Sequence, residues 1–302
     1  MDRVSWIAFS TISIIFGSTF LAIRIGLDYM PPFTFAALRF LLASALLFVY
    51  LWLKQKRISL TLRQFGHLLV IGFFMTAFPF GLTFWGQQFV SSGMAAVLTS
   101  TMPFFVVFLA HFFLAERVTV TKILGVAVGF AGVLLLFIDQ LGSGATLAGG
   151  LALVGSAAGY GVGNVYSKKF GSGIAPDVTN TIQTLVGGII LGVGSLLLER
   201  GHHFTFHWKG VVALLFLSVF GSAAFGLFFW LMQRATVTTM SLIAFAIPVV
   251  SVLLGTIVGE TLSWVMLVGI ILIFIGMALS QGTGERLFRM KNRLSAVLPS
   301  DE

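Results

Sequence analysis

The chain has 302 residues, of which 58% are hydrophobic and only 9% are charged, and its mean hydropathy is +1.03. Soluble domains carry roughly 25% charged residues, so this composition excludes a water-soluble protein and predicts an integral membrane protein. The net charge of +8 resides in short loops, which argues against a nucleic-acid partner, and the absence of cysteine excludes disulfides and thiol chemistry.

Mainly apolar segments of about 20 residues recur along the chain, each long enough to cross a hydrocarbon core of roughly 30 Å. Turn signals such as Pro31-Pro32 separate them. We predict an all-α integral membrane protein with ten transmembrane helices, at residues 4–23, 33–53, 66–87, 93–113, 121–139, 147–167, 178–198, 210–232, 239–258 and 262–281. The first segment has no small-residue cleavage site, so we expect a retained helix rather than a signal peptide.

The distribution of Lys and Arg predicts which side of the membrane each loop faces, because cytoplasmic loops carry an excess of both. With the N-terminus in the cytoplasm, fourteen of the 18 basic residues fall on the cytoplasmic side and three on the outer side. We therefore predict that both termini are cytoplasmic, which requires an even number of helices. A basic tail at residues 285–302 is expected to lie on the cytoplasmic leaflet.

The sequence repeats itself at an offset of 144 to 145 residues: residues 80–88 read FGLTFWGQQ and residues 225–233 read FGLFFWLMQ. Further matches join Phe16-Gly17 to Tyr160-Gly161, Pro103 to Pro248, and Glu116, Gly125 and Gly132 to Glu260, Gly269 and Gly276. Each copy holds five predicted helices, and an odd unit that is duplicated lies inverted relative to its copy. We predict a first repeat at residues 1–144 and a second, inverted repeat at residues 145–284.

Four motifs of the first half carry a family resemblance. They are FGSTFLAIR at 16–24, LRFLLA at 38–43, the run from Pro103 to LAER at 114–117, and GVAVGFAG at 125–132. This ordered set resembles the drug/metabolite transporter superfamily, specifically its EamA-type permeases. The resemblance implies a ten-helix, inverted-repeat carrier of a bacterial inner membrane that exports amino acids or other small metabolites. Two departures are Phe16-Gly17, where Trp-Gly is common, and one residue missing between Pro248 and Glu260.

In carriers built from inverted repeats the solute site lies near the membrane midplane, between the repeats. Recurring aromatic residues are candidates for contact with a solute, and polar residues within spans are candidates because each needs a partner. The predicted cavity residues are Ser18, Thr19, Arg39, Thr76, Phe80, Trp85, Thr99, Tyr160, Asn164, Phe225 and Trp230. Two alternatives stay open: the Trp side chains anchor helix ends at the headgroups, and the hydroxyls bond their own helices.

Two pairs of residues that correspond across the repeat are candidates for hinges or gates. A proline inside a helix removes an N–H and weakens a turn, so Pro103 and Pro248 are either hinges or static kinks. Gln88 and Gln233 lie near opposite membrane sides, where they either gate the pathway or bond helix ends.

Arg39 is the only formal charge well within a predicted span, and such a charge requires a partner or a wet cavity. Its guanidinium either binds a solute carboxylate in a bidentate manner or pairs with Asp28 and fixes the second helix. We favour the pair with Asp28.

No carboxylate lies at the predicted midplane, because the Asp and Glu residues fall at span ends, in loops or in the tails. Proton coupling generally requires a buried titratable group, so we predict uniport or exchange, coupled at most through His111. His202, His203 and His207 have donors for a metal, but we interpret their segment as an interfacial loop and predict no metal and no cofactor.

The sequence thus predicts a secondary transporter of small metabolites or amino acids that works by alternating access, as a monomer or weak homodimer in membrane lipid. A channel or a solute-sensing receptor is the alternative. An intramembrane enzyme is less favoured, because no paired carboxylates, HExxH motif or Ser/His pair falls at the midplane. The run of Gly155, Gly159 and Gly163 predicts a close-packed helix face.

Overall fold

The structure is a computed structural model, which describes residues 3–56, 58–115, 119–138, 144–171, 173–201, 205–232 and 237–280. These residues form helices joined by short connections, as expected where the surroundings offer no water to satisfy backbone groups. The helices are α1 (Arg3–Leu27), α2 (Pro32–Leu53), α3 (Leu62–Gly72), the π-helix η1 (Phe73–Ala77), α4 (Phe78–Gly86), α5 (Ser92–Thr99), α6 (Met102–Leu114), α7 (Val120–Ile138), α8 (Gly144–Phe170), α9 (Pro176–Leu198), α10 (Trp208–Met232), α11 (Val237–Ile257) and α12 (Trp264–Ser280).

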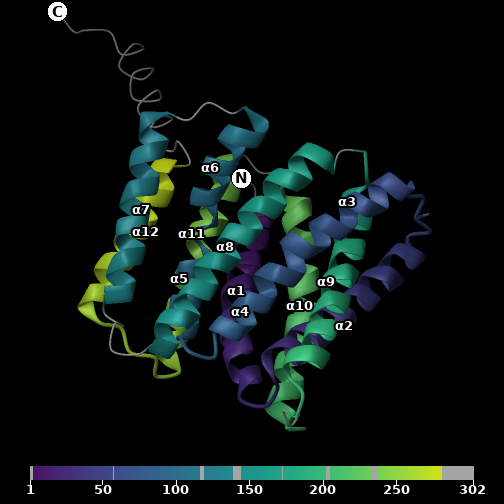
Figure 1. Cartoon of the computed structure of the whole chain (residues 1–302), viewed down its shortest axis with the longest axis horizontal. Helices are drawn as coiled ribbons and strands as arrows, with labels where there is room; N and C mark the ends of the chain where they lie inside the picture. The colour runs from purple at the N-terminus through teal and green to yellow at the C-terminus, as the bar shows by residue number, and fades with distance from the viewer. Residues whose placement is uncertain are drawn as a thin grey trace, which may run out of the picture.

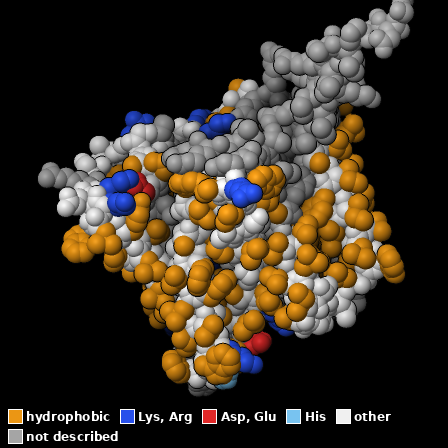
Figure 2. Space-filling model, turned by 180° about the vertical axis from the view of Figure 1, so that it is seen from behind, with side chains coloured by type: hydrophobic (Ala, Val, Ile, Leu, Met, Phe, Trp, Pro, Cys, Tyr) orange, Lys and Arg blue, Asp and Glu red, His pale blue; other side chains and the backbone are white. Residues whose placement is uncertain are grey.

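Seven helical stretches of the described residues are long and apolar enough to cross a membrane. Two of them are composite, because Leu62–Gly86 joins α3, η1 and α4, and Ser92–Leu114 joins α5 and α6. Three shorter apolar helices lie at Val120–Leu136, Ala246–Ile257 and Trp264–Ser280. Figure 2 shows hydrophobic side chains over the middle of the visible face, with charged side chains gathered toward its two ends. The chain is therefore an integral membrane protein.

The helices are arranged so that elements of the two halves of the chain interleave (Figure 1). α7 and α12 stand side by side at one edge of the molecule, and α2, α3 and α9 lie at the other. Between them, α1 packs on α10 and α11, whereas α8 packs on α4 and α6. Each of these contacts, including those of α9 with α2 and α3, joins an element of the first half of the chain to one of the second half.

The third predicted span begins earlier than expected and contains a wider turn. Thr61 accepts from the Gln64 N–H at 3.2 Å and Gln64 accepts from the Thr61 N–H at 2.9 Å, which forms a capping box ahead of Leu62. The Phe78 N–H then bonds the Phe73 carbonyl five residues back, one residue before Pro79. Because Pro79 has no N–H, the π turn lets the helix pass this residue without a break.

The fourth predicted span is present as the stretch Ser92–Leu114, but its helix is interrupted next to Pro103. α5 ends at Thr99 and α6 begins at Met102, with Ser100 and Thr101 between them. Pro103 therefore stands in the first turn of a new helix, where the missing N–H carries no penalty. Pro248, its counterpart in the repeat, remains inside the continuous helix α11.

Glycines let α7 and α12 approach until their backbones touch. A Cβ added at Gly132 would lie 2.5 Å from the Gly269 carbonyl oxygen, and one at Gly276 would lie 2.5 Å from that of Gly125. The predicted glycine face on α8 is confirmed, because a Cβ at Gly159 would meet Phe78 at 2.5 Å. In lipid such close approach gains dispersion contacts that larger side chains prevent.

Carboxylates tie helix ends of the two halves together. Glu199, at the end of α9, accepts from the backbone N–H groups of Phe33 and Thr34 at 2.6 and 2.8 Å. Glu260 in the same way accepts from the N–H groups of Ser92 and Gly93 at 2.7 and 3.1 Å. A carboxylate at a helix N-terminus satisfies orphan donors and complements the helix dipole, so both residues fix the starts of α2 and α5.

Candidate transport cavity

A cavity of about 260 Å³ lies among helices from both halves of the chain. Its lining comes from α1, α2, α4, the α5–α6 break, α8, α10 and α11. The lining residues are Phe16, Thr19, Phe20, Arg39, Phe80, Thr83, Ala96, Thr99, Ser100, Met102, Pro103, Tyr160, Phe225, Ile247 and Pro248. Most of this surface is apolar, with hydroxyls and one guanidinium set into it.

Four aromatic rings form two facing pairs in the cavity wall. Phe16 and Phe225 meet edge to face with their centroids 5.0 Å apart, and Phe80 and Tyr160 do so at 5.6 Å. Edge-to-face packing fixes the orientation of the rings and leaves apolar surface toward the cavity. The wall therefore suits the apolar part of a small solute.

Arg39 supplies the only formal charge among the described residues of the lining. Its side chain is 5% exposed, and its Cζ lies 4.6 Å from the ring centroid of Phe40 and 4.8 Å from that of Phe80. The rings stabilise the cation through their faces but offer no hydrogen-bond acceptor. Its Nη1 accordingly has no hydrogen-bond partner among the described residues.

The predicted ion pair between Arg39 and Asp28 is wrong. Among the described residues the one ion pair joins Lys56 to Asp177. Asp28 is exposed just beyond the end of α1, whereas Arg39 lies two turns inside α2 and turns toward the centre of the molecule. The guanidinium is thus buried without a protein counter-ion in the described part of the chain.

Most lining hydroxyls donate their protons within the protein. Thr19 donates to the Phe16 carbonyl at 2.6 Å, Thr99 to that of Ala95 at 2.8 Å, and Ser100 to that of Val97 at 2.7 Å. This is the back-bonding that the sequence left open as an alternative for the hydroxyls. Since Pro103 has no N–H, the Thr99 carbonyl lacks the donor that a continuous helix would place four residues on.

The structure brings together eight of the residues predicted for the cavity or its hinges: Thr19, Arg39, Phe80, Thr99, Pro103, Tyr160, Phe225 and Pro248. Four others lie outside this lining. Ser18 donates to the Ile15 carbonyl, and Asn164 donates to the Tyr160 carbonyl at 2.8 Å. Thr76 packs against Gly187 of α9. Trp230 packs against the buried cluster formed by Ala8, Ile12, Leu231 and Ile243. Gln233 lies outside the described residues.

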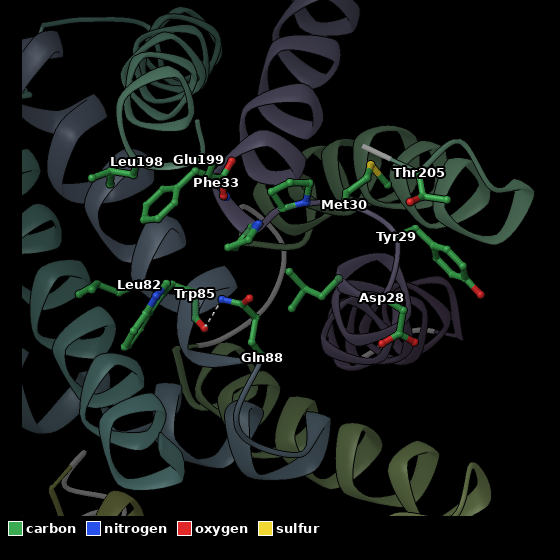
Figure 3. A pocket seen from close by; sticks show the side chains of 13 residues that line it. Asp28, Tyr29, Met30, Phe33, Leu82, Trp85, Gln88, Leu198, Glu199 and Thr205 are labelled. Atoms are coloured by element: carbon green, nitrogen blue, oxygen red, sulfur yellow. Dashed lines mark hydrogen bonds between the residues drawn. The ribbon is translucent and has the colours of Figure 1, made fainter. Parts of the chain in front are cut away.

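Trp85, predicted for the central cavity, and Gln88, predicted as a gate or a helix-end residue, both line a different pocket. That pocket, of about 700 Å³, lies between the end of α4, the α1–α2 connection and the end of α9 (Figure 3). In this view Leu82, Trp85 and Gln88 lie near one another with Phe33 above them, and Asp28 and Tyr29 lie on the other side. The Gln88 side chain donates to the Trp85 carbonyl at 3.0 Å, which agrees with a helix-end role.

Sequence reasoning missed several residues. Seven lining residues were not predicted as site residues: Phe16, Phe20, Thr83, Ala96, Ser100, Met102 and Ile247. Gln87, not Gln88, is the fully buried amide. Its side chain donates to the Phe20 carbonyl and so joins the end of α4 to α1 beside the cavity.

The histidines within helices lie away from the cavity lining. His111, predicted as the one possible coupling group, is exposed on α6 and contacts the Phe112 ring. His67 falls inside α3, where its Nδ1 lies 2.9 Å from the Tyr166 hydroxyl. His202 and His203 lie outside the described residues, and His207 stacks on Tyr29.

A helical membrane protein that encloses an amphipathic cavity among its helices has the architecture of a membrane transporter. The chain belongs to the EamA-like transporter family, which matches residues 4–138 and again residues 147–281. It is therefore a multi-pass inner-membrane transporter rather than an enzyme.

Similar proteins span nearly the whole chain. YoaV of Bacillus subtilis, named an uncharacterized transporter, is 28% identical over 284 residues, 91% of this chain and 96% of that protein. YedA of Escherichia coli K12, named an uncharacterized inner membrane transporter, is 31% identical over 296 residues, 94% of this chain and 92% of that protein. A Salmonella typhimurium protein named a probable amino-acid metabolite efflux pump is 28% identical over 277 residues, 87% and 90% of the two chains.

One solved crystal structure has the same fold, with a TM-score of 0.66 over 95% of this chain and 98% of that one. Its sequence identity is 19%, so the likeness extends to the fold alone.

Proposed function

We propose that the chain is a secondary transporter that moves small metabolites or amino acids by alternating access through the central cavity. The observation that carries the proposal is the cavity itself, whose lining combines aromatic rings, hydroxyls and the buried Arg39 from both halves of the chain. The relative named as a probable amino-acid metabolite efflux pump supports the class of solute.

We propose further that the two halves are inverted repeats, at residues 1–144 and 145–284, with the tail at 285–302 in the cytoplasm. Two ring contacts support this, because the repeat carries one contact onto the other. The offset of 144 to 145 carries Phe16 onto Tyr160 and Phe225 onto Phe80, and both pairs are in ring contact. The family match to each half in turn also fits a duplication.

Ten transmembrane helices with both termini in the cytoplasm remain the topology that we propose. The seven long stretches and the three shorter apolar helices together supply ten candidates. The pair Lys56–Asp177 joins residues that the charge distribution assigns to the same, cytoplasmic side. Two positions at the cavity are the proposed hinges: the α5–α6 break beside Pro103, and Pro248 in α11.

We propose uniport or exchange rather than coupling to protons. The described lining of the cavity contains neither a carboxylate nor an imidazole, and His111 is exposed on α6. Arg39 is protonated throughout the physiological range and cannot carry protons in such a cycle. The pathway that we propose lies within a single chain.

Counterflow in proteoliposomes tests the transporter proposal. Vesicles loaded with one unlabelled solute from a panel of amino acids and small carboxylic acids are diluted into the same labelled solute. We expect saturable uptake that overshoots equilibrium for at least one solute and is lost in Phe80→Ala and Phe225→Ala, which remove the cavity wall. The matched control Phe112→Ala changes a 65% exposed ring on α6 and should transport normally.

Uptake that rises linearly with concentration and shows no overshoot would indicate a channel. Normal counterflow in both Phe80→Ala and Phe225→Ala would place the pathway elsewhere.

A further inference from the structure

We infer that the central cavity selects monoanionic solutes, a single carboxylate on an apolar or aromatic body, over zwitterions and amines. This inference rests on the proposed function and goes beyond it, because it ranks solute classes by charge. It begins from the guanidinium of Arg39, which is 5% exposed and whose Nη1 has no partner among the described residues. A buried donor without an acceptor is costly, and a buried charge without a counter-ion costs more.

The surroundings of Arg39 indicate which kind of hydrogen-bond acceptor would complete the site. Phe40, Phe80 and Phe84 lie under the guanidinium with Cζ-to-centroid distances of 4.6, 4.8 and 5.9 Å. These rings pack against the guanidinium, and its Nη1 has no hydrogen-bond acceptor among the described residues. A carboxylate is the acceptor that matches the fork of a guanidinium, through two parallel hydrogen bonds.

The charge balance of the cavity distinguishes the solute classes. Among the described lining residues Arg39 is the only charged one, so a bound monoanion makes the site neutral. A zwitterion leaves one net positive charge in an apolar site, and an amine leaves two. Because uncompensated charge is expensive at low dielectric, affinity should fall in that order.

The rest of the lining suits the apolar body of the solute. The ring pairs Phe16–Phe225 and Phe80–Tyr160 offer apolar faces within the same cavity. Pockets for drug-sized ligands hold about 300–1,000 Å³, and this one holds about 260 Å³. A solute of one ring and a short carboxylate arm is therefore the size that we infer.

Binding of four compounds that share a phenylpropyl body tests the inference on the purified, full-length wild-type protein. The compounds are 3-phenylpropanoate, phenylalanine, 3-phenylpropylamine and 3-phenylpropan-1-ol, measured by calorimetry at neutral pH. We expect 3-phenylpropanoate to bind most tightly, phenylalanine about tenfold more weakly, and the amine weakest. Equal or tighter binding of phenylalanine or the amine would overturn the inference, as would no binding of any of the four.

Two variants test whether Arg39 is the source of the selectivity. Arg39→Gln should weaken 3-phenylpropanoate by about 10- to 100-fold, the worth of a charge-assisted hydrogen bond, and leave the alcohol unchanged. The control Arg63→Gln removes an exposed charge on α3 and should bind all four as the wild type does. Equal loss of all four compounds in Arg39→Gln would show a purely structural arginine and overturn the inference. If Arg39→Gln does not fold, the wild-type ranking still decides.

Failure of this inference is distinguishable from failure of the transporter proposal. Counterflow of a neutral or zwitterionic solute, with no preference for the acid, would keep the transporter and reject the anion selectivity. Absence of counterflow for every solute in the panel would reject the transporter itself.

Discussion

The contact between α7 and α12 predicts that Gly276→Ala destabilises the protein. An added Cβ would lie 2.5 Å from the Gly125 oxygen and 2.5 Å from the Gly129 nitrogen, both backbone atoms that cannot rotate away. Ordinary contacts of a Cβ begin at 3.4 Å, so the two helices must separate by about 1 Å. Overpacking of this kind costs about 1–3 kcal/mol, and at about 2–4 °C per kcal/mol the midpoint should fall by about 2–12 °C.

Thermal unfolding in detergent measures this change, and the chain offers two matched comparisons. Gly66→Ala adds the same methyl group in α3 with no atom within 4 Å, and alanine is favoured over glycine in a helix, so its midpoint should hold or rise. Gly132 is equivalent to Gly276 in the repeat, so Gly132→Ala should lower the unfolding midpoint by about as much as Gly276→Ala does. An unchanged midpoint in Gly276→Ala, with Gly66→Ala as expected, would refute the backbone-to-backbone packing of α7 and α12.

Three further predictions follow from the ends of the helices and from the titratable groups. Glu199→Gln removes the charge of the carboxylate that accepts hydrogen bonds from the Phe33 and Thr34 N–H groups. It should lower the free energy of unfolding, measured by chemical denaturation, by about 1–3 kcal/mol. An unchanged free energy would show that α2 needs no cap. The hydrogen bond to Asp177 raises the pKa of Lys56 above its usual 10.5. The pair therefore contributes at most about 1 kcal/mol to stability. This contribution is present below pH 10.5 and is lost as the pH rises through the raised pKa. A Lys56→Gln variant should therefore differ from the wild type near pH 8 and converge with it at strongly alkaline pH, and a gap that widens there would contradict the pairing. Solute flux should not depend on a pH gradient, and strong dependence that survives His111→Ala would contradict uniport or exchange.

The membrane class and most helices were predictable because span length follows from the thickness of a bilayer, which the hydrophobic pattern reports directly. The interruption at Ser100 and Thr101 was not predictable in this way, since both residues sit in an apolar stretch. A broken helix is tolerated where protein surrounds it, and that surrounding is a property of the tertiary structure.

Part of the candidate site was predictable from residues that recur in the repeat or carry a charge inside a span. Phe80 and Phe225 recur in the repeat, and Arg39 is a charge inside a span, and all three line the cavity. Trp85 recurs as well, but at about 100° per residue it lies about 140° around the helix from Phe80, and so it faces another pocket. The pairing of Arg39 with Asp28 failed because nearness in sequence says nothing of which way a helix presents its residues.

Access to the cavity from the two sides of the membrane tests the central claim most directly. The chain has no cysteine, so Ser100→Cys places a single thiol in the cavity lining, and Phe112→Cys places one on the exposed face of α6 as a control. A membrane-impermeant thiol reagent is applied to one side at a time, with and without a solute that shows counterflow. The account predicts that Ser100→Cys reacts from both sides, that solute changes the ratio of the two rates, and that Phe112→Cys reacts from neither side. Reaction of Ser100→Cys from one side alone, whatever solute is present, would contradict alternating access through this cavity.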